Sequence, residues 1–378
     1  MPPVLPDPPP AAASQSGGPS GVGPGADDLD LSRPGPGADD LDPELTEAFD
    51  YELPPERIAQ EPIEPRDSAR LLIDRGTGAE HRRVADLPGE LGPGDLVVVN
   101  DTRVVAARLP LVKETGGAAE VLLLEPTGDH RQWQALVKGG RRIRSGAVLR
   151  TGEGEPVVRV GEELGQGRRL VEVLDEAEAV MERAGRIPLP PYIHTALADD
   201  SRYQTVFARH PGSVAAPTAG LHLTPELLTA MAATGADIAR VELRVGLGTF
   251  RPITADKVRD HHMHAESYRI EPEVWRRIEA AERVLAVGTT VVRTLESAAA
   301  TGELAGSTEL FITRSHPWRR VDALLTNFHV PRSSLLVLVD AFVGPRWRQL
   351  YRTALDEGYR FLSFGDAMLL TRRHAGRS

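Results

Sequence analysis

The chain has 378 residues, and its hydrophobic fraction of 41% is enough for a sizeable core in two domains or one large one. The absence of cysteine excludes disulfides, iron–sulfur clusters, thiolate zinc sites and a cysteine nucleophile. A formal net charge of −10 argues against a general nucleic-acid-binding protein, but ten acidic residues fall within residues 1–50, and the nearly neutral remainder can still present a local basic groove.

The first segment, residues 1–45, is rich in Pro, Gly, Ala and Asp and contains the sequence GPGADDLD twice. Such a composition buries too little apolar surface to offset the entropy of ordering, so it predicts a disordered tail. The segment lacks the basic start and apolar stretch of a secretory signal, and the chain has no apolar run of about 18 residues. We therefore expect a cytoplasmic protein that makes no contact with a membrane.

The pattern of the remaining chain changes twice. Residues 56–61 resemble a short helix that ends before Pro62, and 95–101 and 104–109 resemble strands. Short strands then alternate with Gly and charged turns up to about residue 184, which is typical of an antiparallel barrel or sandwich. Helices and strands alternate after that, as in α/β proteins. The sequence therefore predicts an α/β main domain (46–104 and 185–378) with an inserted all-β, barrel-like smaller domain (105–184).

Two polar segments in the main domain are candidate ligand sites. Asn100, Asp101 and Arg103 directly follow a buried strand, where side chains can line a site, although an Asx turn is the simpler interpretation. In the sequence PTAGLHLTP, small residues surround Gly220 and His222, so the backbone could approach a ligand closely. A histidine before a helix can equally be structural.

Two further segments carry charged side chains near glycine or histidine. In ELRVGLGTFRPI a strand ends at two glycines, and Arg251 then offers a fork for a carboxylate or phosphate; a β-bulge is the alternative. In HHMHAE, an extended backbone would place His262, His264 and Glu266 on one face. Their spacing matches no standard zinc signature, so we expect no metal, and acid–base or ribose-hydroxyl contacts or a surface cluster instead.

A buried strand meets Gly288, Thr289 and Thr290 and then an amphipathic helix, whose first free N–H groups form an anion site. Neither a P-loop nor a GxGxxG fingerprint is present. Two weaker groups complete the candidates, at 327–332 before an apolar helix and at Asp366 in a strand-to-helix turn.

These segments together resemble the tRNA ribosyltransferase-isomerase family of queuosine biosynthesis. The similar runs include GDLVVVNDTRVVAARL, SVAAPTAGLH, VGLGTFRPI, HHMHAE, AVGTTVVRTLES, VDALLTNFHVPRSSLLVLV and YRFLSFGDAMLL, in the order of the family and over residues 49–370. The resemblance implies an α/β domain with an inserted β-barrel. It also implies transfer and isomerisation of the ribosyl part of S-adenosylmethionine onto the 7-aminomethyl-7-deazaguanine wobble base of tRNA. Epoxyqueuosine forms, and adenine and methionine leave.

The resemblance assigns roles to the candidates. S-adenosylmethionine is a co-substrate, and no cofactor or metal is expected. Because the positive sulfur acidifies the neighbouring ribose carbon, a weak base is enough to remove the proton from that carbon. The expected catalytic residues are His222, His264, Glu266 and Asp101. The expected substrate-binding residues are Asn100, Arg103, Thr218, Gly220, Arg251, Thr289, Thr290, Arg293, Glu296, Asn327, His329 and Asp366. The expected tRNA-binding residues are Arg141, Arg142, Arg144 and Arg332, although the first three also fit a solvated turn.

Several positions depart from the pattern of the family, among them Arg244, Asp340 and the segment 313–320. They leave open a paralogous S-adenosylmethionine-consuming transferase with another RNA or a small molecule as acceptor. A non-catalytic RNA-binding protein of the same fold and a metal hydrolase are more remote alternatives. We expect a monomer.

Overall fold

The computed structural model describes residues 42–139, 143–165, 167–246 and 252–372. Most of the predicted tail lies outside them, but its last residues belong to the folded chain: the amide N–H of Val258 donates to the carbonyl of Glu44, and Leu45 bridges Lys257. Within the described part of the chain, no helix is long and apolar enough to cross a membrane.

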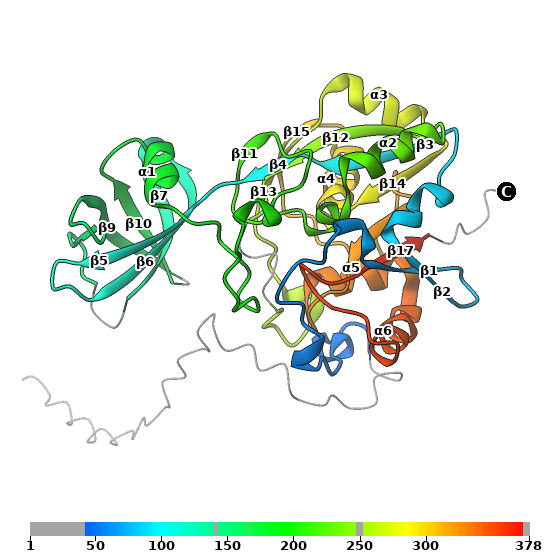
Figure 1. Cartoon of the computed structure of the whole chain (residues 1–378), viewed down its shortest axis with the longest axis horizontal. Helices are drawn as coiled ribbons and strands as arrows, with labels where there is room; N and C mark the ends of the chain where they lie inside the picture. Colours follow the sequence, from blue (N-terminus) through cyan, green and yellow to red (C-terminus); the bar gives the residue numbers. More distant parts are fainter. Residues whose placement is uncertain (1–41, 140–142, 166, 247–251, 373–378) are drawn as a thin grey trace, which may run out of the picture. The chain divides into compact units, whose positions relative to one another are not determined.

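The main domain is built on a nine-stranded sheet in the order β15-β13-β12-β3-β14-β16-β17-β1-β2 (Figure 1). Its strands are β1 (Arg70–Asp74), β2 (Ala79–Arg83), β3 (Asp95–Asn100), β12 (Asp237–Leu243), β13 (Glu266–Arg269), β14 (Arg283–Val287), β15 (Ala305–Thr308), β16 (Ala323–Asn327) and β17 (Ala367–Thr371). The four central strands β12, β3, β14 and β16 are parallel to one another. The side chains of β3, β14 and β16 are almost all buried, as expected for parallel strands covered on both faces, whereas β12 alternates between buried and more exposed residues.

The helices are α1 (Ala177–Ala184), α2 (Pro225–Ala233), α3 (Pro272–Ala280), α4 (Thr289–Thr301), α5 (Ser334–Val343) and α6 (Trp347–Asp356). Helix α2 begins as its sequence predicts: the Thr224 side chain accepts from the amide of Leu227, and Pro225 occupies the first position. The predicted helix at 56–61 is wrong, because only Pro55–Arg57 forms a 3₁₀ turn there. The other 3₁₀ segments are Thr46–Phe49, Arg66–Ser68, Val84–Glu90, Asp200–Tyr203, Thr218–His222, Val258–Asp260 and Gly344–Arg346.

The smaller domain is a closed barrel of six strands in the order β10-β7-β6-β5-β8-β9 (Figure 1). The strands are β5 (Arg108–Lys113), β6 (Ala118–Thr127), β7 (Asp129–Lys138), β8 (Val148–Arg150), β9 (Pro156–Gly165) and β10 (Arg168–Val173). An apolar cluster fills it, with contributions from α1. The predicted fold, an α/β domain with an inserted barrel, is confirmed.

The chain leaves and re-enters the main domain through one narrow connection. Beyond β3, the short strand β4 (Thr102–Val104) pairs in parallel with β11 (His210–Ser213). At the base of the barrel, the amide of Arg108 donates to the carbonyl of Arg186, and the amide of Arg186 donates back to the carbonyl of Arg108. The outgoing and returning chains are therefore hydrogen-bonded to each other where the barrel begins.

Candidate functional site

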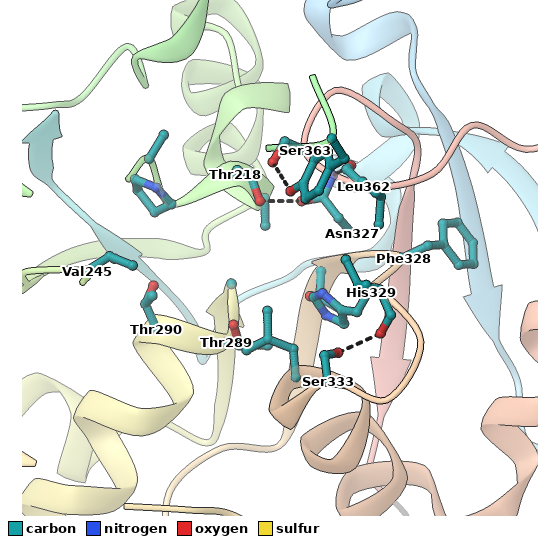
Figure 2. Close-up of a pocket in the computed structure, with 18 residues that line it drawn as sticks. Thr218, Val245, Thr289, Thr290, Asn327, Phe328, His329, Ser333, Leu362 and Ser363 are labelled. Carbon is teal, nitrogen blue, oxygen red and sulfur yellow. Dashed lines mark hydrogen bonds between the residues drawn. The ribbon is translucent and has the colours of Figure 1, made fainter. Parts of the chain in front are cut away.

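A pocket with an empty volume of about 590 Å³ lies at the carboxyl ends of the parallel strands (Figure 2). Val245 follows β12, Thr289 and Thr290 follow β14, and Asn327 ends β16. Ligands of open α/β sheets bind outside the carboxyl ends of the strands. The lining residues are Tyr192, Ala216, Pro217, Thr218, Ala219, Val245, Gly288, Thr289, Thr290, Thr326, Asn327, Phe328, His329, Val330, Ser333, Leu335, Leu362 and Ser363.

Helix α4 points its N-terminus into this pocket. Gly288 turns the chain from β14 into the helix with a φ of 92°, a left-handed conformation that favours glycine. Figure 2 shows Thr289 and Thr290 at the start of the helix, on the wall opposite Thr218 and Asn327. The first N–H groups of a helix have no partner within it, and the helix dipole adds a partial positive charge there. The pocket can therefore hold a carboxylate or phosphate at this wall.

Asn327 is held in one orientation by three neighbours. Its Oδ1 accepts a hydrogen bond of 3.0 Å from the Thr218 hydroxyl, which Figure 2 shows. Its Nδ2 donates to the carbonyl of Leu362 over 3.1 Å and to Nε2 of His222 over 3.2 Å. Thr218 and Asn327 thus form a fixed polar pair in the pocket wall.

The imidazole of His222 lies behind Asn327 and is not among the side chains that line the pocket. It is only 5% exposed. Burial, together with the charges of Arg360 and Arg66, lowers the pKa of His222 to about 4, although a hydrogen bond to the Arg66 backbone acts in the opposite direction. The ring is therefore buried and does not face the pocket. A catalytic role for His222 stays a prediction.

His329 lies in the pocket wall and is fixed at its backbone by two tyrosines. Its amide donates to the Tyr351 hydroxyl over 2.9 Å, and its carbonyl accepts from the Tyr51 hydroxyl over 2.5 Å. Its Nε2 lies 2.9 Å from the Thr326 hydroxyl. Burial lowers the pKa of His329 to about 3, so the ring is neutral at physiological pH.

The sequence of this chain is similar to sequences of known proteins. A family described as "Queuosine biosynthesis protein" matches residues 46–370. The chain belongs to this family. It is 52% identical over 328 residues to a Rubrobacter xylanophilus protein and 49% identical over 338 residues to one from Thermosynechococcus vestitus. Each alignment covers 86% of this chain, and they cover 97% and 95% of the two relatives.

Both relatives are named S-adenosylmethionine:tRNA ribosyltransferase-isomerase. The sequence-based prediction of the family, of an enzyme of the transferase class and of this activity is confirmed. A crystal structure of S-adenosylmethionine tRNA ribosyltransferase from Thermotoga maritima is 35% identical, covers 85% of this chain and 99% of its own, and gives a TM-score of 0.48.

In this member of the queuosine family, Glu266 and Arg293 bind each other. Their side chains form a buried ion pair between β13 and α4. Glu266 also accepts from the amide of Gly246 over 3.0 Å, and Arg293 donates to the carbonyl of Leu310 over 3.1 Å. Neither side chain is among those that line the pocket. This pair joins the edge of the sheet to the helix whose N-terminus forms the anion site, and its predicted contact with substrate is untested.

Three other predicted substrate-binding residues hold backbone rather than line the pocket. Glu296 accepts from the amides of 319, 320 and 321 and from the His316 ring. Burial alone would raise its pKa, but these hydrogen bonds hold the pKa of Glu296 below its usual value. Asp366 accepts from two amides, at 70 and 360, over 2.8 Å each, and burial raises its pKa. Asn100 joins β3 to β12 by bonds to both backbone groups of Leu243.

The remaining predicted residues lie elsewhere. Gly220 packs against Phe207, since an added Cβ would come within 2.8 Å of that ring, so its smallness serves packing rather than approach to a ligand. Asp101 faces a second cleft beside His210. The side chains exposed to solvent are Arg103, Arg144, His264 and Arg332. Arg141, Arg142 and Arg251 lie outside the described residues. In the described ranges, no three His, Asp or Glu side chains are placed to hold a metal.

Sequence reasoning missed several lining residues, including Tyr192, Ser333 and Ser363. Ser333 could have been found, since it caps α5 by accepting from the amide of Leu336. Tyr192 and Ser363 come from distant parts of the chain and are hydrogen-bonded to each other over 2.8 Å. Only the folded chain brings them to the pocket.

Two of the residues that depart from the family pattern, Arg314 and Asp340, bind each other. Arg314 donates two hydrogen bonds to Asp340, of 2.6 and 2.7 Å, and the Asp340 carboxylate is buried. In the same loop, the Trp318 ring packs edge-on against Phe342. Asp340 and Arg314 of the loop 313–320 therefore bind each other, and neither is among the residues that line the pocket.

Proposed function

We propose that the pocket at the N-terminus of α4 binds S-adenosylmethionine, and that the ribosyl group passes from there to the 7-aminomethyl-7-deazaguanine wobble base of tRNA. Its position at the carboxyl ends of β12, β14 and β16 is the observation that carries the proposal. Epoxyqueuosine, adenine and methionine are the products.

The anion site at Thr289 and Thr290 suits the carboxylate of the methionine part of the substrate. Thr218 and Asn327 suit the ribose hydroxyls, because the oxygens of both side chains keep a lone pair that can accept a hydrogen bond in a fixed arrangement. His329 has a pKa far below 7, which makes it a weak base. We therefore assign it a hydrogen bond to the substrate rather than removal of the ribose proton.

The substrate itself tests the carboxylate contact. Titration calorimetry with the full chain compares S-adenosylmethionine with its decarboxylated form. A helix N-terminus stabilises an anion by about 0.3–2 kcal/mol, so we expect the decarboxylated compound to bind roughly 2- to 30-fold more weakly. Equal affinities would show that the carboxylate does not rest on α4.

A pair of matched variants tests the rest of the pocket. Thr218→Val removes the hydroxyl that orients Asn327, and we expect adenine release to fall about tenfold or more, as for one lost hydrogen bond to a substrate-binding group. Thr229→Val makes the same change on the exposed side of α2 and should leave the rate unchanged. Equal rates for both variants would place the reaction elsewhere. We further propose that the protein acts in the cytoplasm as a monomer, which sedimentation equilibrium tests.

A further inference from the structure

A second cleft, of about 1120 Å³, lies beside the first parallel strand of the sheet. Strand β12 forms its floor, and residues from the β3–β4 connection, the start of β11, β13 and α3 line it. The lining residues are Asp101, Arg209, His210, Ile238, Arg240, Val241, Glu242, Arg244, Arg269, Glu271, Val274 and Arg277. Five arginines thus face three carboxylates in a chain whose net charge is −10.

The arginines of this cleft differ in their partners. Arg244, Arg269 and Arg277 each pair with a carboxylate of the same surface, at 2.8, 3.0 and 2.6 Å. Arg209 and Arg240 are exposed and form no ion pair with any carboxylate in the described part of the chain. The cleft therefore keeps an excess of positive charge that the protein itself does not neutralise.

The spacing of the arginines suits an extended anion. Arg240 and Arg244 lie four residues apart along extended chain and face the same side, which separates their backbones by roughly 13 Å. Backbone hydrogen bonds from Arg209 to Asp101 and from Asp101 to Val241 place Arg209 two chain rows away, about 10 Å to the side. Successive phosphates of a polyanion can contact arginines spread over such a surface.

The cleft is connected to the pocket by continuous chain. Arg244 lines the cleft, and the next residue, Val245, lines the pocket. The Arg244 side chain lies over Gly212, where an added Cβ would come within 3.3 Å of it, so the glycine leaves room for the guanidinium. A nucleic acid strand that brings its acceptor base to the pocket would therefore pass close to this surface.

We propose that the arginine cleft binds backbone phosphates of the tRNA next to the nucleotide that is modified, with Arg209 and Arg240 as its principal contacts. The inference rests on the proposed function of the pocket. Arginine suits this role because its planar fork can donate two hydrogen bonds to one phosphate. Such contacts position the RNA and carry no sequence information themselves.

The test measures the salt dependence of tRNA binding by fluorescence anisotropy, with an unmodified tRNA transcript and the full chain. Each phosphate contact adds about 0.7–0.9 to the slope of log K against log salt concentration. We expect Arg209→Ala/Arg240→Ala to lower this slope by about 1.4–1.8 and the affinity near 0.1 M salt by at least about tenfold. Arg209→Lys/Arg240→Lys keeps the charges and should retain most of the slope.

The charge-matched control is Arg75→Ala/Arg82→Ala, which removes two exposed arginines at the β1–β2 edge of the same sheet. It should leave the slope unchanged. An equal slope in wild type and Arg209→Ala/Arg240→Ala, or an equal loss in the control, would overturn the inference. The inference would also fail if the cleft bound only inorganic phosphate. In that case phosphate would raise the melting temperature of wild type but not that of Arg209→Ala/Arg240→Ala, while this double variant kept the wild-type slope for tRNA.

Calorimetry of S-adenosylmethionine separates this inference from the proposed function. The two double alanine variants, at 209 and 240 and at 75 and 82, should bind S-adenosylmethionine as wild type does, because none of these four arginines lines the pocket. A wild-type protein that fails to bind it in the pocket would refute the proposed function. Normal binding together with an unchanged tRNA slope in Arg209→Ala/Arg240→Ala would refute only the role of the cleft.

Discussion

The buried ring of His222 makes a specific prediction about stability in acid. The pKa of His222 is about 4 in the folded chain and 6.5 in the ordinary, exposed state. Because the folded value is the lower one, the unfolded chain binds an extra proton between these two values. The stability that the neutral ring contributes is therefore complete above about pH 6.5 and is lost as the pH falls towards 4. The full difference corresponds to about 3 kcal/mol.

The variant His222→Gln removes this titration and leaves an amide oxygen to accept from Asn327. Its unfolding free energy should be lower than that of wild type at about pH 7.5, because the new side chain fits the site less well. The gap should shrink by about 2 kcal/mol when the pH is lowered to about 5, since wild type alone loses the contribution of the ring. All other titrating groups cancel in this comparison.

Urea unfolding followed by tryptophan fluorescence measures the gap, at constant ionic strength and with the slope m checked for two-state behaviour. Adenine release by the same preparations should fall as well, because the more flexible glutamine holds Asn327 less firmly than the His222 ring does. A gap that stays constant between the two pH values would refute a buried neutral imidazole. An unchanged rate of adenine release would show that the wall of the pocket does not depend on the His222 ring.

Three further changes have defined outcomes. Arg314→Ala, Asp340→Ala and the double variant form a cycle, and we expect a coupling of at least about 1 kcal/mol in urea unfolding; additive effects would refute this pairing. Glu296→Gln should lower the unfolding free energy by about 2–4 kcal/mol, since one oxygen that accepts buried donors becomes a donor, and a loss within 0.5 kcal/mol would contradict this. Dialysis against EDTA should leave adenine release unchanged, whereas activity restored only by added zinc or iron would show a metal enzyme.

The sequence predicted the architecture well because its periodicity reports burial directly. Buried runs such as 95–100 and 283–287 are parallel strands, and the change of pattern near 105 and 185 marks the barrel. Helix α1 escaped prediction because its eight residues follow a strand without a polar cap. At 56–61 the chain forms only the 3₁₀ turn Pro55–Arg57, because Pro62 leaves too few residues for a stable helix.

The candidate site was predicted by region but less well by residue. Thr218, Thr289, Thr290, Asn327 and His329 do line one pocket. The other polar candidates look the same in sequence, because the residue types that bind ligands are also those that hold buried backbone, as the carboxylates of 296 and 366 do. Which of the two roles a side chain takes depends on the direction it points, and that is set by packing between distant segments.

The doubly hydrogen-bonded base of the barrel also bears on how the chain finds its fold. Strands β3 and β12 are neighbours in the sheet, but the whole barrel separates them along the chain. Closing the chain between them, residues 101–236, as a flexible loop costs about 4 kcal/mol of entropy. Because Arg108 and Arg186 already hold the two ends of the barrel together, a barrel that folds first shortens this loop and lowers the cost by about 1 kcal/mol before the sheet assembles. The insertion then acts as a short turn, so its length and surface can vary without weakening the pairing of β3 with β12.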